Sequence, residues 1–581
     1  MENLLGNYYY LMSESMRNIA RVKAYSLLKG TDVLKENAMP TGKRTMTVRV
    51  DGKPKYFTVS DPDIYYALVG VHNDWFHKSV KKWITLPKRF ITRGVTFRPA
   101  FRIANFLRDT MQTMVLHGDA KRVFRTCKAA VDAYKNHPDF VEFASQGGAF
   151  SGTFDNPSDA SKVIKEATSS RNWWNVPGNI LKVWDDLGTA AENANRLALY
   201  RERVEQGNSK AEAALVAKDL MDFSMHGQSG LARGLITLVP FLNARIQGLY
   251  KLGRGYTEDR AGFLKRAAVV AGLSAANAIL NATLFGDGWD ELEDYDRWNY
   301  WHFGPGTKWG FRIPMPFEVG ALFGALPTLA AEYLRKDAGE ATKDLGKWAA
   351  SFLTQTMMFN PVQVGMPIIE TWADKNFFTG RPIEGKQFEG AKASERYNPW
   401  TSNTMKLLGE VTGFSPLKMD HLLTQYFGGY HEMGKLVMDH TLVPLVEAMG
   451  HSAFPEDPAL TRRDYWFVGR FMGGGEIPRN TRYDTEFYEL MQEYDEVYST
   501  YLLKQKRMDK REAKRYGKDH REELKLQKRG QKVRTKLTKI RTRMRMVWYN
   551  NKLSDDQKRV ELDKLQAKRN KIMKEAVEEI K

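Results

Sequence analysis

The feature that most constrains this chain is a run of twenty residues without a charged side chain, Ala267–Gly286. A helix of about 20 residues rises about 30 Å, the thickness of a membrane hydrocarbon core. The same length suits a helix buried in a large helical protein. Asn277 and Asn281 are one turn apart on one face, where they could form interhelical hydrogen bonds in either setting. We expect a helix that is buried in protein at rest and that inserts into a membrane conditionally.

The residues of this run that we expect to contact lipid are Ala267, Val270, Leu273, Ile279, Leu280 and Leu284. Two further apolar segments are less suited to spanning, because Val319–Ala331 is short and Trp348–Ile369 contains Pro361 and Pro367. The mean hydropathy of −0.50 argues against a protein with many membrane spans. A conditionally inserting protein therefore fits better than a permanently embedded one.

The remaining pattern predicts a mainly α, elongated multi-helix protein. Residues 1–38 and 63–140 are expected to be helical, with a break at 92–99, and so are 402–411 and 418–448. A small β-hairpin is expected near residues 45–60, since two alternating segments flank Asp51–Gly52. We divide the chain into an N-terminal helical region with this hairpin (1–145), a helical core with the apolar helices (146–480) and a basic helical tail (481–581).

The basic character of the protein belongs to its tail. Residues 504–581 contain 28 Lys and Arg against 12 Asp and Glu, a net charge of +16 out of +19 for the whole chain. Such a surface could neutralise phosphates without reading sequence, or it could be a solvated helix or one that docks on an acidic protein. The candidate nucleic-acid contacts are Lys504, Lys506, Arg507, Lys510, Arg511, Lys514, Arg515, Lys532, Arg534, Lys536, Lys539, Arg541, Arg543 and Arg545. Ser554 and Gln557 predict a capping box that starts the last helix.

No pattern of a catalytic, metal or cofactor site stands out, so we expect a protein that is not an enzyme and needs no cofactor. The single cysteine, Cys127, excludes an internal disulfide and is expected to be a small buried side chain. Gly429–Lys435 has the glycine and lysine spacing of a phosphate-binding loop, but Leu436 stands where Ser or Thr would bind magnesium. The carboxylates of Asp287–Asp296 do not have EF-hand spacing and predict a solvated acidic turn beside an aromatic belt.

A set of short segments carries a family resemblance: Asp51–Gly52, Asp61–Pro62, Phe97–Asn105 with Arg108–Asp109, Glu192–Arg196, Asp222–Ser224 with Gly227, Val239–Ala244 with Gln247–Gly248, Ile313–Gly320, Asn398–Ser402, and Ser415–Pro416 with Tyr426–Gly429. Together these segments cover roughly residues 45–475, and they resemble the large polyvalent protein associated domains of tailed-phage proteins. The resemblance implies an internal virion protein that is packaged with the genome and ejected into the host. It supplies packing signatures and no catalytic residues.

On this resemblance we expect a homo-oligomer above the portal, in contact with phage DNA and other internal virion proteins. After ejection it would join a DNA-translocating conduit across the host envelope, moving from the capsid interior to the periplasm and inner membrane. Two alternatives stay open. One is a DNA-coating or anti-restriction protein that enters with the genome, and the other is a static structural protein of the head or connector.

Overall fold

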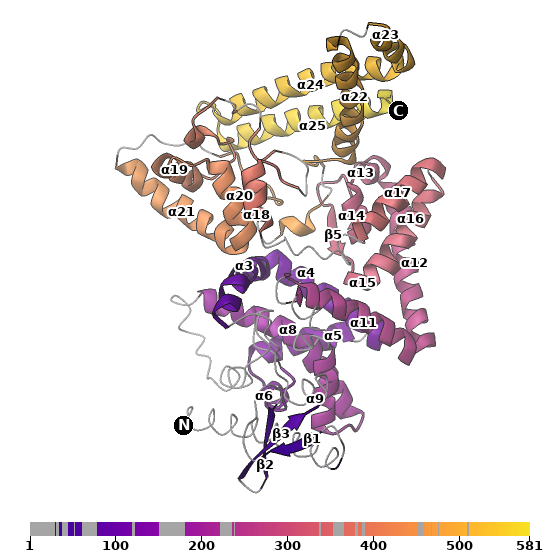
Figure 1. Cartoon of the computed structure of the whole chain (residues 1–581), viewed down its shortest axis with the longest axis vertical. Coiled ribbons are helices and arrows are strands. Elements are labelled where there is room, and N and C mark those ends of the chain that lie inside the picture. The colour runs from indigo at the N-terminus through magenta and orange to yellow at the C-terminus, as the bar shows by residue number, and fades with distance from the viewer. Residues whose placement is uncertain are drawn as a thin grey trace. The chain divides into compact units, whose positions relative to one another are not determined.

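The computed structural model confirms a mainly α protein (Figure 1). It describes residues 30, 34–37, 45–50, 53–60, 78–118, 122–149, 180–220, 235–236, 239–335, 338–352, 365–377, 382–385, 388, 390–449, 457–465, 468–473, 476–507 and 510–580. The chain divides into two compact units. The first comprises residues 1–264, 353–373 and 422–431, and the second comprises 265–352, 374–421 and 432–581.

The first unit contains a three-stranded antiparallel sheet in the order β1 (Leu34–Asn37), β3 (Lys53–Val59), β2 (Thr45–Val50). The register pairs Val50 with Lys53, so β2 and β3 form the predicted hairpin, although its turn at residues 51–52 lies outside the described residues. The prediction of helix for residues 1–38 is wrong at 34–37, which form β1 and pair with β3. Pairing with a later strand overrides the local helical pattern there.

Several helices of the first unit lie among the described residues. They are α3 (Lys78–Phe97), α4 (Pro99–His117), α5 (Arg122–Tyr134), α6 (Pro138–Ser145), α8 (Ile180–Glu205), α9 (Lys210–Asp219), α11 (Leu242–Glu258) and α18 (Met366–Ala373). The break expected at 92–99 is present but narrower than expected, because α3 continues to Phe97 and only Arg98 separates it from α4. Cys127 on α5 is exposed, so the expectation of a buried thiol is wrong. Its neighbour Thr126 takes the buried position instead.

The helix expected over 418–448 is two helices, α20 (Pro416–Phe427) and α21 (Gly429–Ala448), with Gly428 between them. Gly428 has a φ of +46°, a left-handed conformation that a residue with a Cβ adopts only with strain. A Cβ added to Gly428 would also lie 2.6 Å from the carbonyl oxygen of Gly94 on α3. The break is therefore set by a backbone contact with a distant helix.

Helix α12 (Arg260–Leu284) leads into the second unit. There the short helices α13 (Gly286–Asp290) and α14 (Asp294–Asn299) precede a two-stranded hairpin of β4 (Tyr300–Phe303) and β5 (Phe311–Pro314). The elements that follow are α15 (Phe317–Gly320), a π-helical turn η2 (Ala321–Ala325), α16 (Leu326–Tyr333), α17 (Ala338–Phe352), η5 (Ala393–Glu395), α19 (Asn403–Thr412) and η6 (Gly469–Phe471). Helix α19 confirms the helix expected at 402–411.

The C-terminal part of the second unit is a helical bundle of α22 (Arg482–Lys506), α23 (Lys510–Asp519), α24 (Arg521–Trp548) and α25 (Asp555–Ile580). Figure 1 shows α24 and α25 side by side, and α22 packs against both. Their shared core contains Phe487, Met491, Tyr494, Leu537, Met573, Ala576, Val577 and Ile580. The predicted capping box is present, since the Ser554 N–H donates to Gln557 at 3.1 Å and the Gln557 N–H donates to the Ser554 hydroxyl at 3.3 Å.

A buried ion pair joins the first turn of α22 to α25. Arg569 pairs with Asp484, whose side chains are 9% and 0% exposed. Asp484 also accepts a hydrogen bond from the Thr481 N–H at 2.9 Å and thereby caps α22. One carboxylate therefore serves both as helix cap and as counterion between two helices of the bundle.

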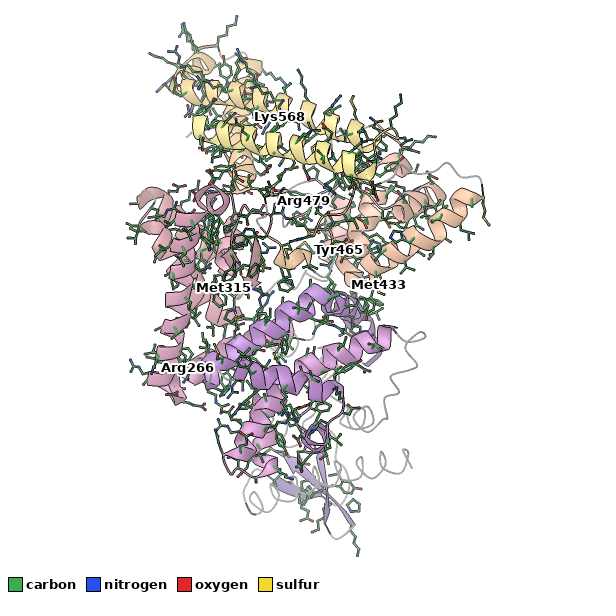
Figure 2. The ribbon with its side chains drawn as sticks, turned by 180° about the vertical axis from the view of Figure 1, so that it is seen from behind. Arg266, Met315, Met433, Tyr465, Arg479 and Lys568 are labelled. Atoms are coloured by element: carbon green, nitrogen blue, oxygen red, sulfur yellow. The ribbon has the colours of Figure 1, made fainter. Side chains whose placement is uncertain are left out.

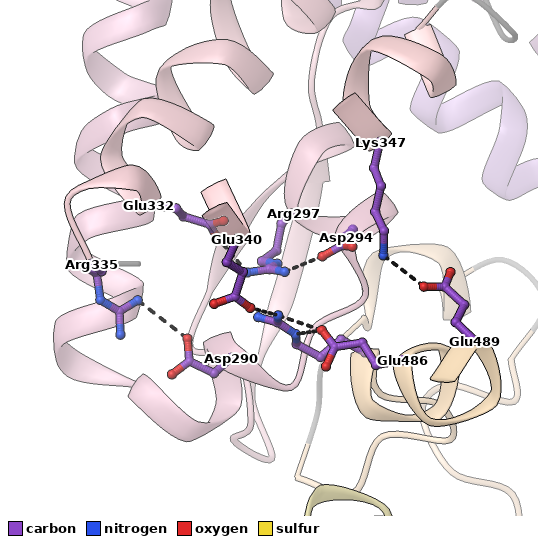
Figure 3. A network of polar contacts seen from close by, with 10 residues as sticks. Asp290, Asp294, Arg297, Glu332, Arg335, Glu340, Lys347, Glu486 and Glu489 are labelled. Atoms are coloured by element: carbon purple, nitrogen blue, oxygen red, sulfur yellow. Dashed lines mark hydrogen bonds and ion pairs between the residues drawn. The ribbon is translucent and has the colours of Figure 1, made fainter. Parts of the chain in front are cut away.

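A second network joins α22 to the elements that precede the bundle (Figure 3). Arg482 bonds to Glu340 of α17 at 3.1 Å and to Glu486 at 2.7 Å, and Lys347 of α17 pairs with Glu489 at 3.3 Å. Beside them the fully buried Arg297 of α14 donates to Glu332 of α16 at 2.9 Å. Polar contacts of the largely buried Arg482 and of the more exposed Lys347–Glu489 pair therefore attach the bundle to the rest of its unit.

The substitution Asp484→Ala should destabilise the bundle by about 3–5 kcal/mol, because it leaves the Arg569 guanidinium buried without its counterion and removes the α22 cap. The measurement is hydrogen exchange of α25 peptides in the full-length protein under increasing urea. Glu561→Ala is the matched control, because its ion pair with Lys564 is exposed on both sides and should contribute less than about 1 kcal/mol. Equal effects of the two substitutions would contradict the assignment.

Candidate nucleic-acid interface

Helix α24 concentrates the basic charge of the chain. Residues 524–554 contain eleven Lys and Arg and no Asp or Glu, and most of them lie on α24. The buried residues of α24 that face the bundle include Leu537 and Ile540. The direction of each basic side chain relative to this buried face decides whether it can meet a ligand.

Seven exposed basic residues follow one face of α24 at intervals that keep them in line along the helix. We name this surface the basic stripe: Lys525, Lys528, Arg529, Lys532, Lys536, Lys539 and Arg543. From Lys525 to Arg543 the helix rises about 27 Å. Lys525 pairs with Glu522 at 2.6 Å, and the stripe carries no carboxylate of its own beyond that point.

Three of the predicted basic contacts on α24 lie off the stripe. Arg534 pairs with Asp495 of α22 at 2.6 Å, and Arg541 donates to the Tyr488 hydroxyl at 3.0 Å. Arg545 is half-buried. Arg534 and Arg541 therefore hold α24 against the bundle. The predicted residues Lys532, Lys536, Lys539 and Arg543 belong to the stripe. Prediction from the sequence missed Lys525, Lys528 and Arg529, which the helical period of α24 could have identified.

The other predicted contacts lie at the end of α22 and on α23. Lys504 is half-buried, pairs with Glu512 and lies 5.4 Å from the centre of the Tyr516 ring, so it belongs to the packing of α22 on α23. The remaining residues of this group are exposed: Lys506, Arg507, Lys510, Arg511, Lys514 and Arg515. They form a second basic surface, separate in sequence from the stripe.

The basic stripe has the chemistry of a phosphate-backbone contact. Its cations are Lys ammonium groups and Arg guanidinium groups in line along one helix, and such groups bind phosphate oxygens whatever the base sequence. DNA presents one negative charge per about 1.7 Å of helix axis, so a stripe about 27 Å long faces many phosphates. The arrangement suits binding that ignores sequence and weakens steeply with salt.

The predicted membrane residues lie on two different faces of α12. Leu273, Ile279, Leu280 and Leu284 are between 48% and 67% exposed, whereas Ala267 and Val270 are 1% and 6% exposed. Among the helices that the structure describes, α12 alone is long and apolar enough to cross a membrane, and 33% of its most apolar window is buried. The helix is therefore packed on one side and open on the other.

The packed side of α12 is polar and binds the β4–β5 hairpin. The side-chain amide groups of Asn277 and Asn281 each donate to the backbone carbonyl oxygen of His302 at 2.8 Å. The side-chain oxygen Oδ1 of Asn277 accepts a hydrogen bond from the backbone N–H of His302 at 3.1 Å. The indole N–H of Trp301 donates to the Ser274 hydroxyl at 2.8 Å. The two asparagines thus share one face as predicted, and their partner is a strand of the same chain.

His302 is buried beneath this contact and is neutral at pH 7. Burial lowers its pKa to about 4, and Arg312 adds to the lowering while Asp296 opposes it. Nε2 lies 3.2 Å from the Asp296 carbonyl oxygen, and Nδ1 is buried without a hydrogen-bond partner among the described residues. A proton on Nδ1 would therefore place a charge where nothing accepts it.

The acidic turn after α12 is exposed to solvent at Asp287, as expected, and its carboxylates also form ion pairs. Asp287 pairs with Lys574 at 2.9 Å, Asp290 with Arg335 at 3.5 Å, and Asp296 with Arg312. Among the described residues no group of three or more His, Cys, Asp or Glu side chains is placed to hold a metal ion. Lys435, the last residue of the loop-like pattern, lies within α21 and pairs with Asp420 at 2.6 Å.

Comparison with protein-family models gives one match, over residues 286–469, from the start of α13 into η6. With its helical fold, this makes the chain a phage-related helical protein. The domain that it contains over those residues is large polyvalent protein associated domain 38, which confirms the predicted family. The match is shorter than the resemblance in the sequence, and both α12 and the bundle lie outside it. No curated protein and no solved structure is significantly similar to the chain.

Neutralising three residues of the basic stripe (Lys532→Gln, Lys536→Gln, Lys539→Gln) should weaken DNA binding and reduce the slope of log K against log salt by about 2–3, since each lost phosphate contact removes about 0.9. Fluorescence anisotropy with duplexes of unrelated sequence measures this slope. The control removes the same charge from α25 (Lys564→Gln, Lys568→Gln, Lys571→Gln), whose exposed surface also carries carboxylates. If the control lowered the slope equally, net charge and not the stripe would determine binding.

Acidification should loosen α12 from the hairpin. The unfolded pKa of His302 is 6.5 and the folded pKa is about 4, so the unfolded chain takes up a proton first as pH falls. The stabilisation is complete above pH 6.5 and is lost towards pH 4, by at most about 3 kcal/mol. Hydrogen exchange of α12 peptides, corrected for intrinsic rates, should show this loss, and His302→Gln should remove it. His117→Gln, in the first unit, should leave the α12 profile unchanged, and a pH response that survives His302→Gln would refute the assignment.

Proposed function

We propose that this protein is an internal virion protein of a tailed phage, packaged with the genome and ejected with it to help DNA cross the host envelope. The observation that carries the proposal is the basic stripe of α24, in the compact unit that also contains most of a large polyvalent protein associated domain. The domain supports the phage context, and the stripe provides a surface for the molecule that such a particle contains. On this proposal the role is binding and not catalysis.

Inside the capsid the stripe lies against packaged DNA. A surface that contacts only phosphates binds any part of a genome, which suits a protein packed at high DNA concentration. The other partners in this proposal are further copies of the chain, other internal virion proteins and the portal. Since stripe binding depends on released counterions, it weakens when DNA is diluted out of the particle at higher salt.

After ejection the protein acts in the periplasm and at the inner membrane, as part of a DNA-translocating conduit. The feature that supports an envelope role is α12, whose outward residues are apolar and exposed. The same chain would thus contact DNA through α24 and the envelope through α12.

Fractionation of phage particles before and after triggered genome release tests the proposal. The protein should be present in full particles, absent from emptied ones, and recovered with the membrane fraction of infected cells. Retention in emptied particles would instead indicate a static head or connector protein. Recovery in the host cytoplasm bound to DNA, without membrane association, would indicate a DNA-coating or anti-restriction role.

A further inference from the structure

Helix α12 has its polar and apolar sides reversed relative to an ordinary surface helix. Ser274, Asn277 and Asn281 lie on one face and are all hydrogen-bonded to the residues of β4. The small residues Ala278 and Ala282 pack beside them against Trp289 and Leu292. The polar groups of α12 are therefore already satisfied by protein, and nothing on this face requires water.

The opposite side, which we call the outer face, consists of Val269, Leu273, Ile279, Leu280 and Leu284, all between 48% and 67% exposed. Leu273, Leu280 and Leu284 recur at intervals of seven and four residues and so lie in line along the helix. A row of large apolar side chains left in water is unfavourable by about 25 cal/mol for each Å² that a partner could cover. Such contiguous apolar surface marks a place for an apolar partner.

The ends of the outer face indicate which partner. Lys265 and Arg266 lie at its N-terminal end, where Figure 2 labels Arg266, and residues 260–286 contain no acidic residue. At the other end Phe285 packs edge-on against Trp309, with ring centres 5.8 Å apart and Trp309 55% exposed. Cations and an exposed tryptophan flanking an apolar strip suit the headgroup region of an anionic bilayer.

We propose that α12 binds an anionic lipid bilayer in the plane of its surface, with the outer face in the acyl region and the polar face still docked on the β4–β5 hairpin. Spanning the bilayer would instead separate Ser274, Asn277 and Asn281 from their partners. Unpaired polar groups in hydrocarbon are unfavourable by several kcal/mol each. In-plane binding leaves every one of these hydrogen bonds intact and requires no unfolding. It also restricts the predicted lipid contacts to Leu273, Ile279, Leu280 and Leu284, with Val269 added.

Depth-dependent fluorescence quenching tests this geometry in the full-length protein. In a Cys127→Ser background, single cysteines at positions Val269, Leu273, Leu280 and Leu284 carry a fluorophore and are mixed with vesicles of phosphatidylcholine and phosphatidylglycerol containing lipids brominated at known depths. An in-plane helix places the four labels at similar depths, about 5–10 Å into the headgroup and acyl boundary. A profile that deepens towards the middle of α12 and rises at both ends would mean that it spans the bilayer, and would overturn the proposal.

Vesicle flotation supplies the affinity test. Leu273→Lys with Leu280→Lys should lower the partition coefficient at least about tenfold, because two large apolar side chains no longer enter the acyl region. The control is Leu334→Lys with Leu345→Lys, two leucines of the same unit that are 82% and 47% exposed but lie outside α12. An equal loss in the control, no binding of the unaltered protein, or cross-linking of α12 to a second copy in place of lipid would each refute the proposal. DNA binding by the stripe is measured on the same variants, so failure here is distinct from failure of the proposed function.

Discussion

The second unit depends on the first turn of α22, where two oppositely charged side chains reach in different directions. Arg482 bonds to Glu340 of α17, and Asp484 pairs with Arg569 of α25. Buried charges are costly unless each meets its counterion, so these contacts tolerate only one arrangement of the elements they join. The matched domain ends at residue 469, and α22 begins shortly after it. This turn is therefore one of the places at which the basic bundle is attached to the polyvalent-protein domain, together with the Asp287–Lys574 ion pair.

The same logic explains how a bundle with so much positive charge can fold. Helix α22 is acidic, and its carboxylates serve as internal counterions for basic residues of the neighbouring helices, as Asp495 does for Arg534. Those basic residues of α24 that have no such partner lie on its far side as the basic stripe, where water screens their repulsion. The position of the stripe thus follows from the charges of two helices. A basic side chain of α24 that pairs with a carboxylate of α22 faces the bundle, and the unpaired basic side chains of the stripe face solvent.

The sequence predicted local structure correctly where the conformation of a short segment depends on that segment alone. The capping box of Ser554 and Gln557 and the β2–β3 hairpin are of this kind. Features that depend on a distant partner were not predictable: β1 exists because it pairs with β3, and α20 ends at Gly428 because the backbone of Gly94 lies against it. The basic residues of α24 show the same limit. Their charge was evident, but only the position of the bundle core separates the inward Arg534 from the outward Lys536.

The uncharged run Ala267–Gly286 is the segment whose role depends most on a distant partner. Two asparagines in such a run weaken the case for a transmembrane helix when composition alone is considered, because amide groups are costly in hydrocarbon. Here both amides are held by the backbone of His302, so they no longer bear on what the opposite side of α12 contacts. The polar residues therefore do not argue against membrane contact. Because they attach one face of the helix to protein, they determine which leucines remain exposed. The partner of an apolar helix is thus decided less by its mean hydropathy than by which of its faces the fold has already used.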